Sequence, residues 1–246
     1  MARFQKRRAR LRHHRSEQDD VAHARLRSRQ RRIPGARIPA PVVAQFLREN
    51  RVVSEKFDFN SLLFLLTPGV EASKAGTLVS ALVAFKRQHD DNAPLESAIP
   101  RFVAAHGKRY RGLRLRDLCQ EMHAFFCGEN ASALQKAQFA AEHLPEPAMT
   151  PQEAARALTR NNVDYLPIDQ IEGRIAATLF VVYPPGIATI VPGERLDRRA
   201  RPMIEYLKVF ERISNLFPGF ETEVQGIYRE VDGAGATRLH TYVVRE

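Results

Sequence analysis

Residues 51–69 read RVVSEKFDFNSLLFLLTPG, and this stretch decides the fold prediction. Two runs rich in β-branched, aromatic and leucine residues, 51–57 and 61–66, flank the turn-forming residues 58–60. Threonine, proline and glycine at 67–69 end the second run, because proline and glycine interrupt regular structure. The sequence therefore predicts two neighbouring strands.

Helical patterns surround these strands. A short amphipathic helix is expected over 42–48, with Asn50 as its stop, and a longer helix from Ser73 as N-cap to about His89. The longer helix carries one apolar stripe that we expect to be core: Ala75, Leu78, Val79, Leu82 and Val83. Three further helical patterns cover 95–106, 115–127 and 132–143. Strands followed by helices predict an α/β sheet with its helical cover.

A proline-rich stretch around residue 146 marks a predicted domain border. Thr150 and Glu153 have the spacing of a capping box at the start of the next helix. Beyond it we expect strands at 176–183, 188–191, 222–230 and 237–244, and a helix at 201–217. The predicted organisation is a disordered basic tail (1–32), an α/β domain (33–145) and an α+β C-terminal domain (146–246).

The chain has the composition of an ordinary soluble protein. Of its 246 residues, 44% are hydrophobic and 27% charged, and no apolar run reaches the length of a membrane span. Two cysteines do not make a disulfide framework, and no secretory h-region follows the basic start. We therefore expect a cytoplasmic protein.

Cys119, His123 and Cys127 recur every four residues on a predicted helix. The outer two are about 12 Å apart along such a helix, too far for all three to chelate one ion. We expect packed thiols, a surface histidine and no metal site.

The formal net charge of +10 lies almost wholly in the tail. Residues 1–32 contain twelve Arg or Lys and three acidic residues, a net of +9, which leaves +1 for the remainder. Clustered arginine suits a non-specific phosphate-binding arm. The favoured alternative is an incidental extension of the chain, for example from an upstream start or a shifted frame.

Motifs for self-contained hydrolase, dehydrogenase or NTPase chemistry are absent from the sequence: GxSxG, GxGxxG and the phosphate loop do not occur. Seven unusual strings occur instead, in this order: IPAPVV (38–43), VVSEK (52–56), FKR (85–87), GRIAA (173–177), YPPG (183–186), PGE (192–194) and FPGF (217–220). In order and separation, they resemble the C-terminal portion of the bacterial ornithine/lysine/arginine decarboxylases, which have the aspartate-aminotransferase fold. The resemblance covers residues 33–246.

This resemblance implies an oligomeric, multidomain lyase that uses pyridoxal phosphate to remove the α-carboxylate of a basic amino acid. Residues 33–145 would be the end of the aminotransferase-type small domain. The family's cofactor lysine stands in a Ser-x-His-Lys motif, and none of the seven lysines here follows a histidine. Because the cofactor is the electron sink, we expect no catalytic residue, no bound cofactor and no activity in this chain alone. Arginine is the first expected substrate, from FKRQHDDNAP (85–94), then lysine or ornithine.

Glu55 is the expected substrate-binding residue. The resemblance implies that its carboxylate binds the distal cationic group of the substrate through a charge-assisted bond. Phe57, Asp58 and Phe59 depart from the usual family pattern after Glu-Lys, and a solvated or ion-paired carboxylate is the equally weighted alternative.

Three residues are candidates for the mouth of the active site, with structural roles as the favoured alternative: Arg174, Tyr183 and Glu194. An arginine next to Gly173 would more often brace loop carbonyls than bind a ligand. Tyr183 begins a stiff Pro-Pro-Gly turn, and Glu194 follows a Pro-Gly turn.

Three functions remain open at this stage. In the first, the chain complements a separately encoded large domain as part of a split enzyme; in the second, it joins full-length decarboxylase oligomers as a non-catalytic partner. Nucleic-acid binding through the tail ranks last, because the remainder is nearly neutral and carries no nucleic-acid motif.

An exposed apolar patch is also expected, where the missing domain would pack.

Overall fold

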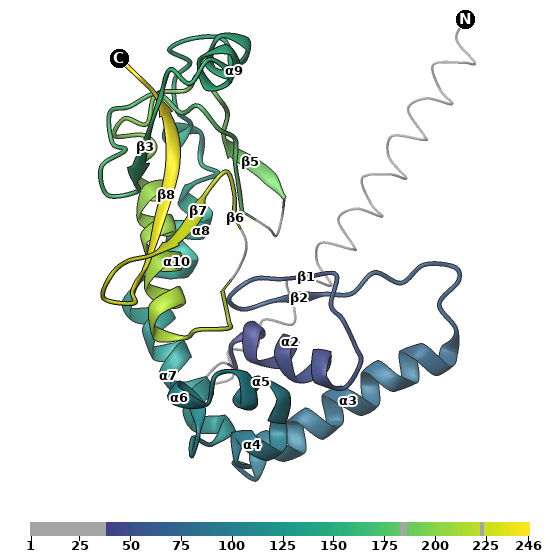
Figure 1. Ribbon diagram of the computed structural model, residues 1–246. Coiled ribbons are helices and arrows are strands. Elements are labelled where there is room, and N and C mark those ends of the chain that lie inside the picture. Colours follow the sequence, from purple (N-terminus) through teal and green to yellow (C-terminus); the bar gives the residue numbers. More distant parts are fainter. Residues whose placement is uncertain (1–37, 183–185, 222–223) are drawn as a thin grey trace, which may run out of the picture. The chain divides into compact units, whose positions relative to one another are not determined.

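The computed structural model describes residues 38–182, 186–221 and 224–246, and these form a mixed α/β structure (Figure 1). The basic tail lies outside the described residues. None of the described helices is long and apolar enough to cross a membrane.

Helix α2 (Ala40–Glu49) begins with a proline in its first turn and buries Val42, Phe46 and Leu47. Asn50 ends it, as predicted, and the Asn50 side-chain amide donates to the Phe46 carbonyl at 2.8 Å. This bond satisfies a carbonyl that the helix end leaves without an intrahelical donor.

The two strands predicted from residues 51–69 form, but they are much shorter than expected. Strands β1 (Lys56–Phe57) and β2 (Leu62–Leu63) pair antiparallel as an isolated two-stranded hairpin. The flanking apolar side chains of Val53, Leu65 and Leu66 are exposed. Among the described residues no further strand pairs with this hairpin. Nothing therefore packs against these side chains to stabilise longer strands.

Helix α3 (Ala72–Asp90) has Glu71 as its N-cap, so the prediction of Ser73 as the cap is wrong. The Ser73 hydroxyl donates to the Glu71 carboxylate at 3.2 Å. The expected apolar stripe is only partly core: Val79 is 60% and Val83 45% exposed, while the fully buried positions are Ala81 and Phe85.

The helical region after α3 is more divided than the sequence predicts. Pro100, which has no backbone N–H, breaks the expected helix over 95–106 and begins the second of its two pieces. The elements are α4 (Leu95–Ala98), α5 (Pro100–Ala105), α6 (Gly107–Tyr110), α7 (Leu115–Gly128), α8 (Ala131–Ala137) and the 3-10 turn η1 (Ala141–His143). Helix α7 buries Leu115, Leu118, Cys119, Met122 and Phe126.

Helix α9 (Pro151–Thr159) starts with the predicted capping box. The Glu153 backbone N–H donates to the Thr150 hydroxyl at 3.3 Å, and the Thr150 N–H donates to the Glu153 carboxylate at 2.8 Å. Strand β3 (Val163–Pro167) follows directly and was not predicted.

Two antiparallel three-stranded sheets complete the described chain, in the orders β3-β8-β7 and β5-β4-β6. Their remaining strands are β4 (Phe180–Val182), β5 (Ile187–Ile190), β6 (Val224–Gln225), β7 (Tyr228–Val231) and β8 (Thr237–Val244). Leu239, Thr241 and Val243 of β8 are buried, in the alternation of a strand with one packed face. Helix α10 (Arg201–Leu216) packs on β8.

Residues 217–220, the FPGF string, follow α10 and pack against the helical region of α5 and α6. Gly219 has φ +92°, and a Cβ there would lie 2.6 Å from His106 Nε2 and from Phe102 Cε2. The Tyr110 hydroxyl donates to the Pro218 carbonyl at 2.9 Å, and Phe220 packs on Phe102. Glycine is needed here both for its positive φ and for its lack of a side chain.

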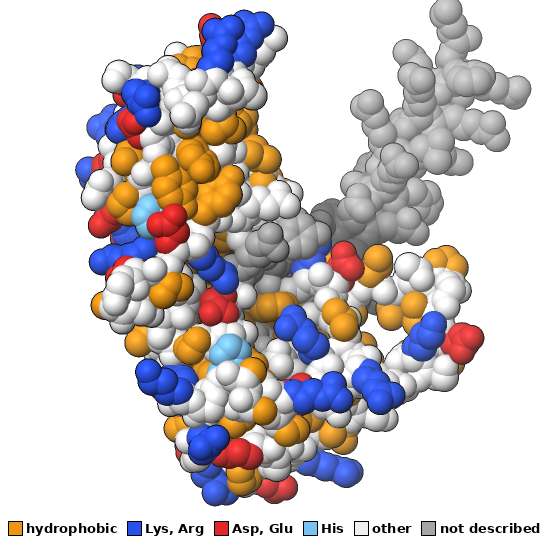
Figure 2. Space-filling view, viewed as in Figure 1, with side chains coloured by type: hydrophobic (Ala, Val, Ile, Leu, Met, Phe, Trp, Pro, Cys, Tyr) orange, Lys and Arg blue, Asp and Glu red, His pale blue; other side chains and the backbone are white. Residues whose placement is uncertain are grey.

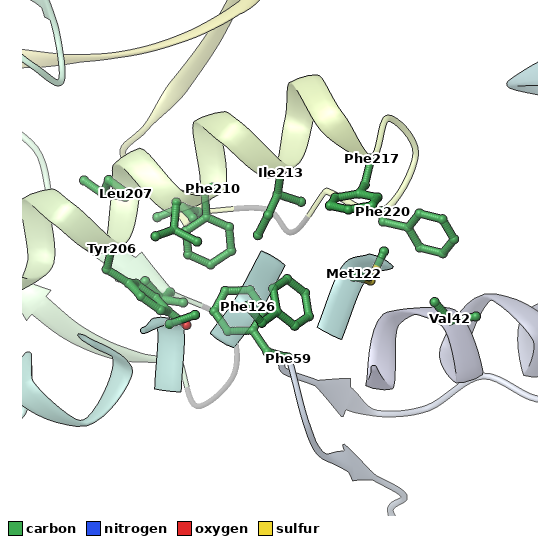
Figure 3. Close-up of a cluster of buried hydrophobic side chains, with 14 of the residues drawn as sticks. Val42, Phe59, Met122, Phe126, Tyr206, Leu207, Phe210, Ile213, Phe217 and Phe220 are labelled. Carbon is green, nitrogen blue, oxygen red and sulfur yellow. The ribbon is translucent and has the colours of Figure 1, made fainter. Parts of the chain in front are cut away.

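One hydrophobic cluster joins residues from both sides of position 146 (Figure 3). Its aromatic centre contains Phe59, Phe126, Tyr206 and Phe210, which come from the hairpin turn, α7 and α10. The domain border near 146 remains a prediction.

Candidate functional site

The turn between β1 and β2 is organised by the Asp58 carboxylate. Its Oδ1 accepts hydrogen bonds from the backbone N–H groups of Asn60 at 2.7 Å and Ser61 at 2.6 Å, and its Oδ2 from the Ser61 hydroxyl at 2.7 Å. The Asp58 N–H donates to the Ser61 carbonyl at 3.0 Å. An aspartate that binds backbone groups two and three residues ahead fixes a tight turn.

Phe59, at the tip of this turn, anchors the hairpin in the core. Its side chain is 3% exposed, and its ring centroid lies 4.6 Å from that of Phe126 and 5.6 Å from those of Tyr206 and Phe210. Figure 3 shows the Phe59 ring directed into the cluster beneath α10. The turn is therefore held by polar bonds within it and by one buried ring.

A hollow of about 690 Å³ lies between this hairpin and α8. Its lining combines two lysines and an aspartate with apolar side chains: Lys56, Phe57, Asp58, Ser61, Leu62, Leu63, Gln135, Lys136 and Phe139. The Asn60 side chain donates to the Ser132 hydroxyl at 3.0 Å, which ties the turn to α8. This is the volume of a small-molecule site.

Glu55 lies at a bend directly before β1, with its backbone N–H donating to the Leu63 carbonyl at 2.9 Å. Its side chain is exposed, and no hydrogen bond or ion pair joins its carboxylate to another described residue. The lining of the hollow includes the next residue, Lys56, and not Glu55. A partnerless exposed carboxylate is available for a cationic group, but the described residues build no closed pocket around it.

Arg174 is held in an ion-pair network at the chain's C-terminal strand. Its Nη2 lies 2.6 Å from Asp164 Oδ2 and donates to the Val244 carbonyl at 3.2 Å, while Arg245 Nε lies 2.9 Å from Asp164 Oδ1. The hydrogen bond from Arg174, followed by that from Arg245, lowers the pKa of Asp164 below its ordinary value. These contacts are those of a bracing arginine.

Glu194 closes the Pro-Gly turn that contains it. Its Oε2 accepts from the Val191 N–H at 2.7 Å. Partial burial raises its pKa above the ordinary value, and the bond from Val191 opposes that rise. The neighbouring Gly193 has φ +94°, and a Cβ there would lie 2.4 Å from the Met149 carbonyl oxygen. Tyr183, the third mouth candidate, lies outside the described residues.

The structure does not bring Glu55, Arg174 and Glu194 together through any contact among the described residues. The sequence predicts a turn at Asp58 and Phe59 but indicates no role for them, and the structure shows that they position the hairpin after Glu55. An aspartate with asparagine and serine two and three residues later, as in Asp58-Phe59-Asn60-Ser61, is typical of an Asx turn and was available in the sequence. The burial of Phe59 had no such signal.

The lysines of the described chain do not fit a buried Schiff-base site. None is among the buried residues, and two form surface ion pairs, Lys86 with Asp90 and Lys208 with Glu205. The described residues also contain no group of three or more metal-ligating side chains.

Comparison with known proteins shows which family this chain resembles. Residues 132–245 match the profile of the Orn/Lys/Arg decarboxylase C-terminal domain. The chain is also 42% identical over 208 residues to the inducible ornithine decarboxylase of Escherichia coli K12, a match that covers 85% of this chain. The chain matches the C-terminal portion of the Orn/Lys/Arg decarboxylase family. This confirms the resemblance found in the sequence.

Other relatives in the family carry lysine in their names. The lysine decarboxylase of Pseudomonas aeruginosa PAO1 is 41% identical over 198 residues. The solved lysine decarboxylase A from that species superposes with a TM-score of 0.79 at 38% identity, covering 86% of this chain and 28% of the solved chain. The constitutive lysine decarboxylase of Escherichia coli superposes with a TM-score of 0.75 at 32% identity, covering 85% and 28%.

The chain spans about 28% of the length of these decarboxylases. The relatives described above are ornithine and lysine decarboxylases, so they give no support to arginine, the substrate placed first from residues 85–94.

Proposed function

We propose that this chain supplies the C-terminal portion of a pyridoxal-phosphate-dependent decarboxylase that acts on ornithine or lysine. The observation that carries the proposal is the 42% identity over 208 residues to an ornithine decarboxylase. In this proposal residues 33–145 are the end of an aminotransferase-type small domain, and 146–246 are the C-terminal domain. The chain is cytoplasmic and works with a cofactor-binding portion.

Pyridoxal phosphate would be held by that other portion. When bound, the cofactor stabilises the electron pair left by the departing carboxylate. A Schiff-base lysine needs a buried site in which its amine is unprotonated, and the described lysines are solvent-accessible. This chain alone therefore does not decarboxylate amino acids.

Glu55 is the group through which the chain contributes to substrate binding. Its carboxylate is exposed and has no partner among the described residues, and the Asp58 turn and the Phe59 anchor fix the hairpin beside it. A carboxylate and a substrate ammonium form a charge-assisted hydrogen bond, which strengthens when the cofactor-binding portion excludes water.

Complementation tests this proposal. The full chain is co-expressed with the part of the Escherichia coli inducible ornithine decarboxylase that it does not match, and diamine release from ornithine and lysine is measured. Formation of diamine together with an internal-aldimine absorbance supports the proposal. Co-purified portions that give neither signal would contradict it.

A matched pair of variants isolates Glu55. In the active combination, Glu55→Gln is expected to raise KM at least about tenfold, since it removes a hydrogen bond between charged groups. Glu142→Gln changes another exposed glutamate far along the chain and should leave KM unchanged. An unchanged KM for Glu55→Gln would remove Glu55 from the binding site.

A second candidate function, assembly with full-length decarboxylase, is favoured by exposed apolar side chains. The segment from β2 to α3 exposes Leu63, Leu65, Leu66, Val79 and Val83, and Val53 is exposed before β1. Figure 2 shows hydrophobic side chains on the surface of the part of the molecule that contains these elements. Exposed apolar side chains of this kind suit a protein partner. Co-elution with full-length enzyme in size-exclusion chromatography supports assembly, and separate elution at micromolar concentration excludes it.

A further inference from the structure

The hollow of about 690 Å³ between the β1–β2 hairpin and α8 has two walls that are each fixed to the core. Phe59 anchors the hairpin wall, and α8 packs on α10. Two side-chain hydrogen bonds join the walls, from Asn60 to the Ser132 hydroxyl at 3.0 Å and from the Gln135 amide to the Asp58 carboxylate at 3.5 Å. The hollow therefore exists before any ligand binds.

Both walls present large apolar side chains to solvent. Leu63 of the hairpin is 54% exposed, and Phe139, which follows α8, is 39% exposed. Phe57 and Leu62 also line the hollow and are half-buried. A ligand that covers these side chains removes apolar surface from water, which is favourable. The hollow therefore favours a ligand with an apolar body.

Two ammonium groups lie in the same lining. Lys136 is exposed at the end of α8, and no hydrogen bond or ion pair joins its ammonium group to another described residue. Lys56 enters the lining from β1, on the opposite wall. Ammonium groups donate charge-assisted hydrogen bonds to carboxylates and to other oxyanions.

The one carboxylate of the lining, that of Asp58, is occupied by donors of the protein. Its Oδ1 accepts from the backbone N–H groups of Asn60 and Ser61. Its Oδ2 accepts from the Ser61 hydroxyl and the Gln135 amide. These four donors match the roughly four acceptor positions of a carboxylate. The charge that the lining leaves open to a ligand is therefore positive, that of Lys136 above all.

We propose that this hollow binds a small amphipathic carboxylate, of which a medium-chain fatty acid is the simplest example. The acyl chain covers Leu63 and Phe139, and the Lys136 ammonium donates to the carboxylate. Ornithine and lysine do not suit the hollow, because their distal ammonium groups would meet ammonium groups and apolar side chains. No covalent bond forms or breaks. The site goes beyond the proposed decarboxylase function and does not depend on it.

Fluorescence titration of the full chain with 8-anilino-1-naphthalenesulfonate tests the site. This probe combines an aromatic body with an anionic group, and its emission rises when it leaves water. Octanoate should displace the probe, and octylamine, which has the same chain length and a cationic head, should do so at least about fivefold less well. Absence of saturable emission, or equal displacement by the two compounds, would overturn the proposal.

Two pairs of variants locate the bound probe, with circular dichroism as the check on folding. Lys136→Glu should weaken probe binding at least about tenfold, because repulsion replaces attraction. Lys108→Glu, at an exposed lysine outside the lining, should leave it unchanged. Phe139→Ala should weaken it at least about threefold through lost apolar contact. Leu66→Ala, at an exposed leucine outside the lining, should leave it unchanged. Equal probe affinities within either pair would contradict the site.

Discussion

The rings of Phe59 and Phe126 lie with their centroids 4.6 Å apart, and this contact connects the hairpin that follows Glu55 to helix α7. Phe59 is the only described residue of the turn 58–61 that is buried, so the ring carries the hydrophobic attachment of the turn.

Replacement of Phe59 by alanine should cost about 3–5 kcal/mol of unfolding free energy, because it leaves a cavity among Phe126, Tyr206 and Phe210. Phe139→Ala is the matched control, since Phe139 is 39% exposed and should cost less than about 1 kcal/mol. Urea denaturation measures both. Equal losses for the two variants would show that Phe59 is not an anchor.

The close packing around Gly219 leads to a second prediction about stability. Gly219→Ala adds a Cβ against His106 and Phe102 at φ +92° and should cost about 2–5 kcal/mol. Gly112→Ala is the control: its φ is +80°, and nothing lies within 4 Å of an added Cβ, so only the backbone cost of about 1–2 kcal/mol applies. Thermal melts that give equal losses of unfolding free energy for the two variants would disprove the steric contact at Gly219.

Loss of the capping box at α9 is expected to have a smaller effect on stability. Thr150→Ala removes the acceptor for the Glu153 N–H and should cost about 1 kcal/mol, whereas Thr150→Ser keeps the hydroxyl and should cost less. The two melting temperatures should therefore differ from each other. A serine variant as unstable as the alanine variant would assign the loss to the methyl group instead.

The Asp164 network predicts a dependence of stability on pH. Because the pKa of Asp164 is lowered in the folded chain, its contribution is present above the unfolded pKa of about 3.9 and is lost as pH falls through the lower folded value. Wild type should therefore be more stable than Asp164→Asn at pH 6, and this difference should shrink below about pH 4. Asp169→Asn, at an exposed aspartate, serves as the control. A wild-type to Asp164→Asn difference that is constant between pH 6 and pH 2 would contradict the network.

Local chemistry explains what the sequence predicted well. The Asn50 stop and the Thr150 and Glu153 capping box depend on bonds between near neighbours. The family resemblance was likewise visible in short ordered strings, and the comparisons confirm it.

Features that depend on distant contacts were predicted poorly. The strands at 51–57 and 61–66 are cut to two residues each, because the described chain places no further strand beside them. Val79 and Val83 have the helical spacing of core residues but are exposed, since periodicity shows which residues share a face and not what covers that face. The comparisons give no support to arginine, which the sequence ranked first from residues 85–94, and a short string does not describe a pocket.

The most direct test of the central claim is diamine release by the purified full chain, supplied with pyridoxal phosphate and with ornithine or lysine. Without the cofactor-binding portion of a relative, we expect no diamine and no internal-aldimine absorbance; with that portion, we expect both. Diamine formed by the chain alone would contradict the account, because it would require a Schiff-base lysine that the described residues do not provide.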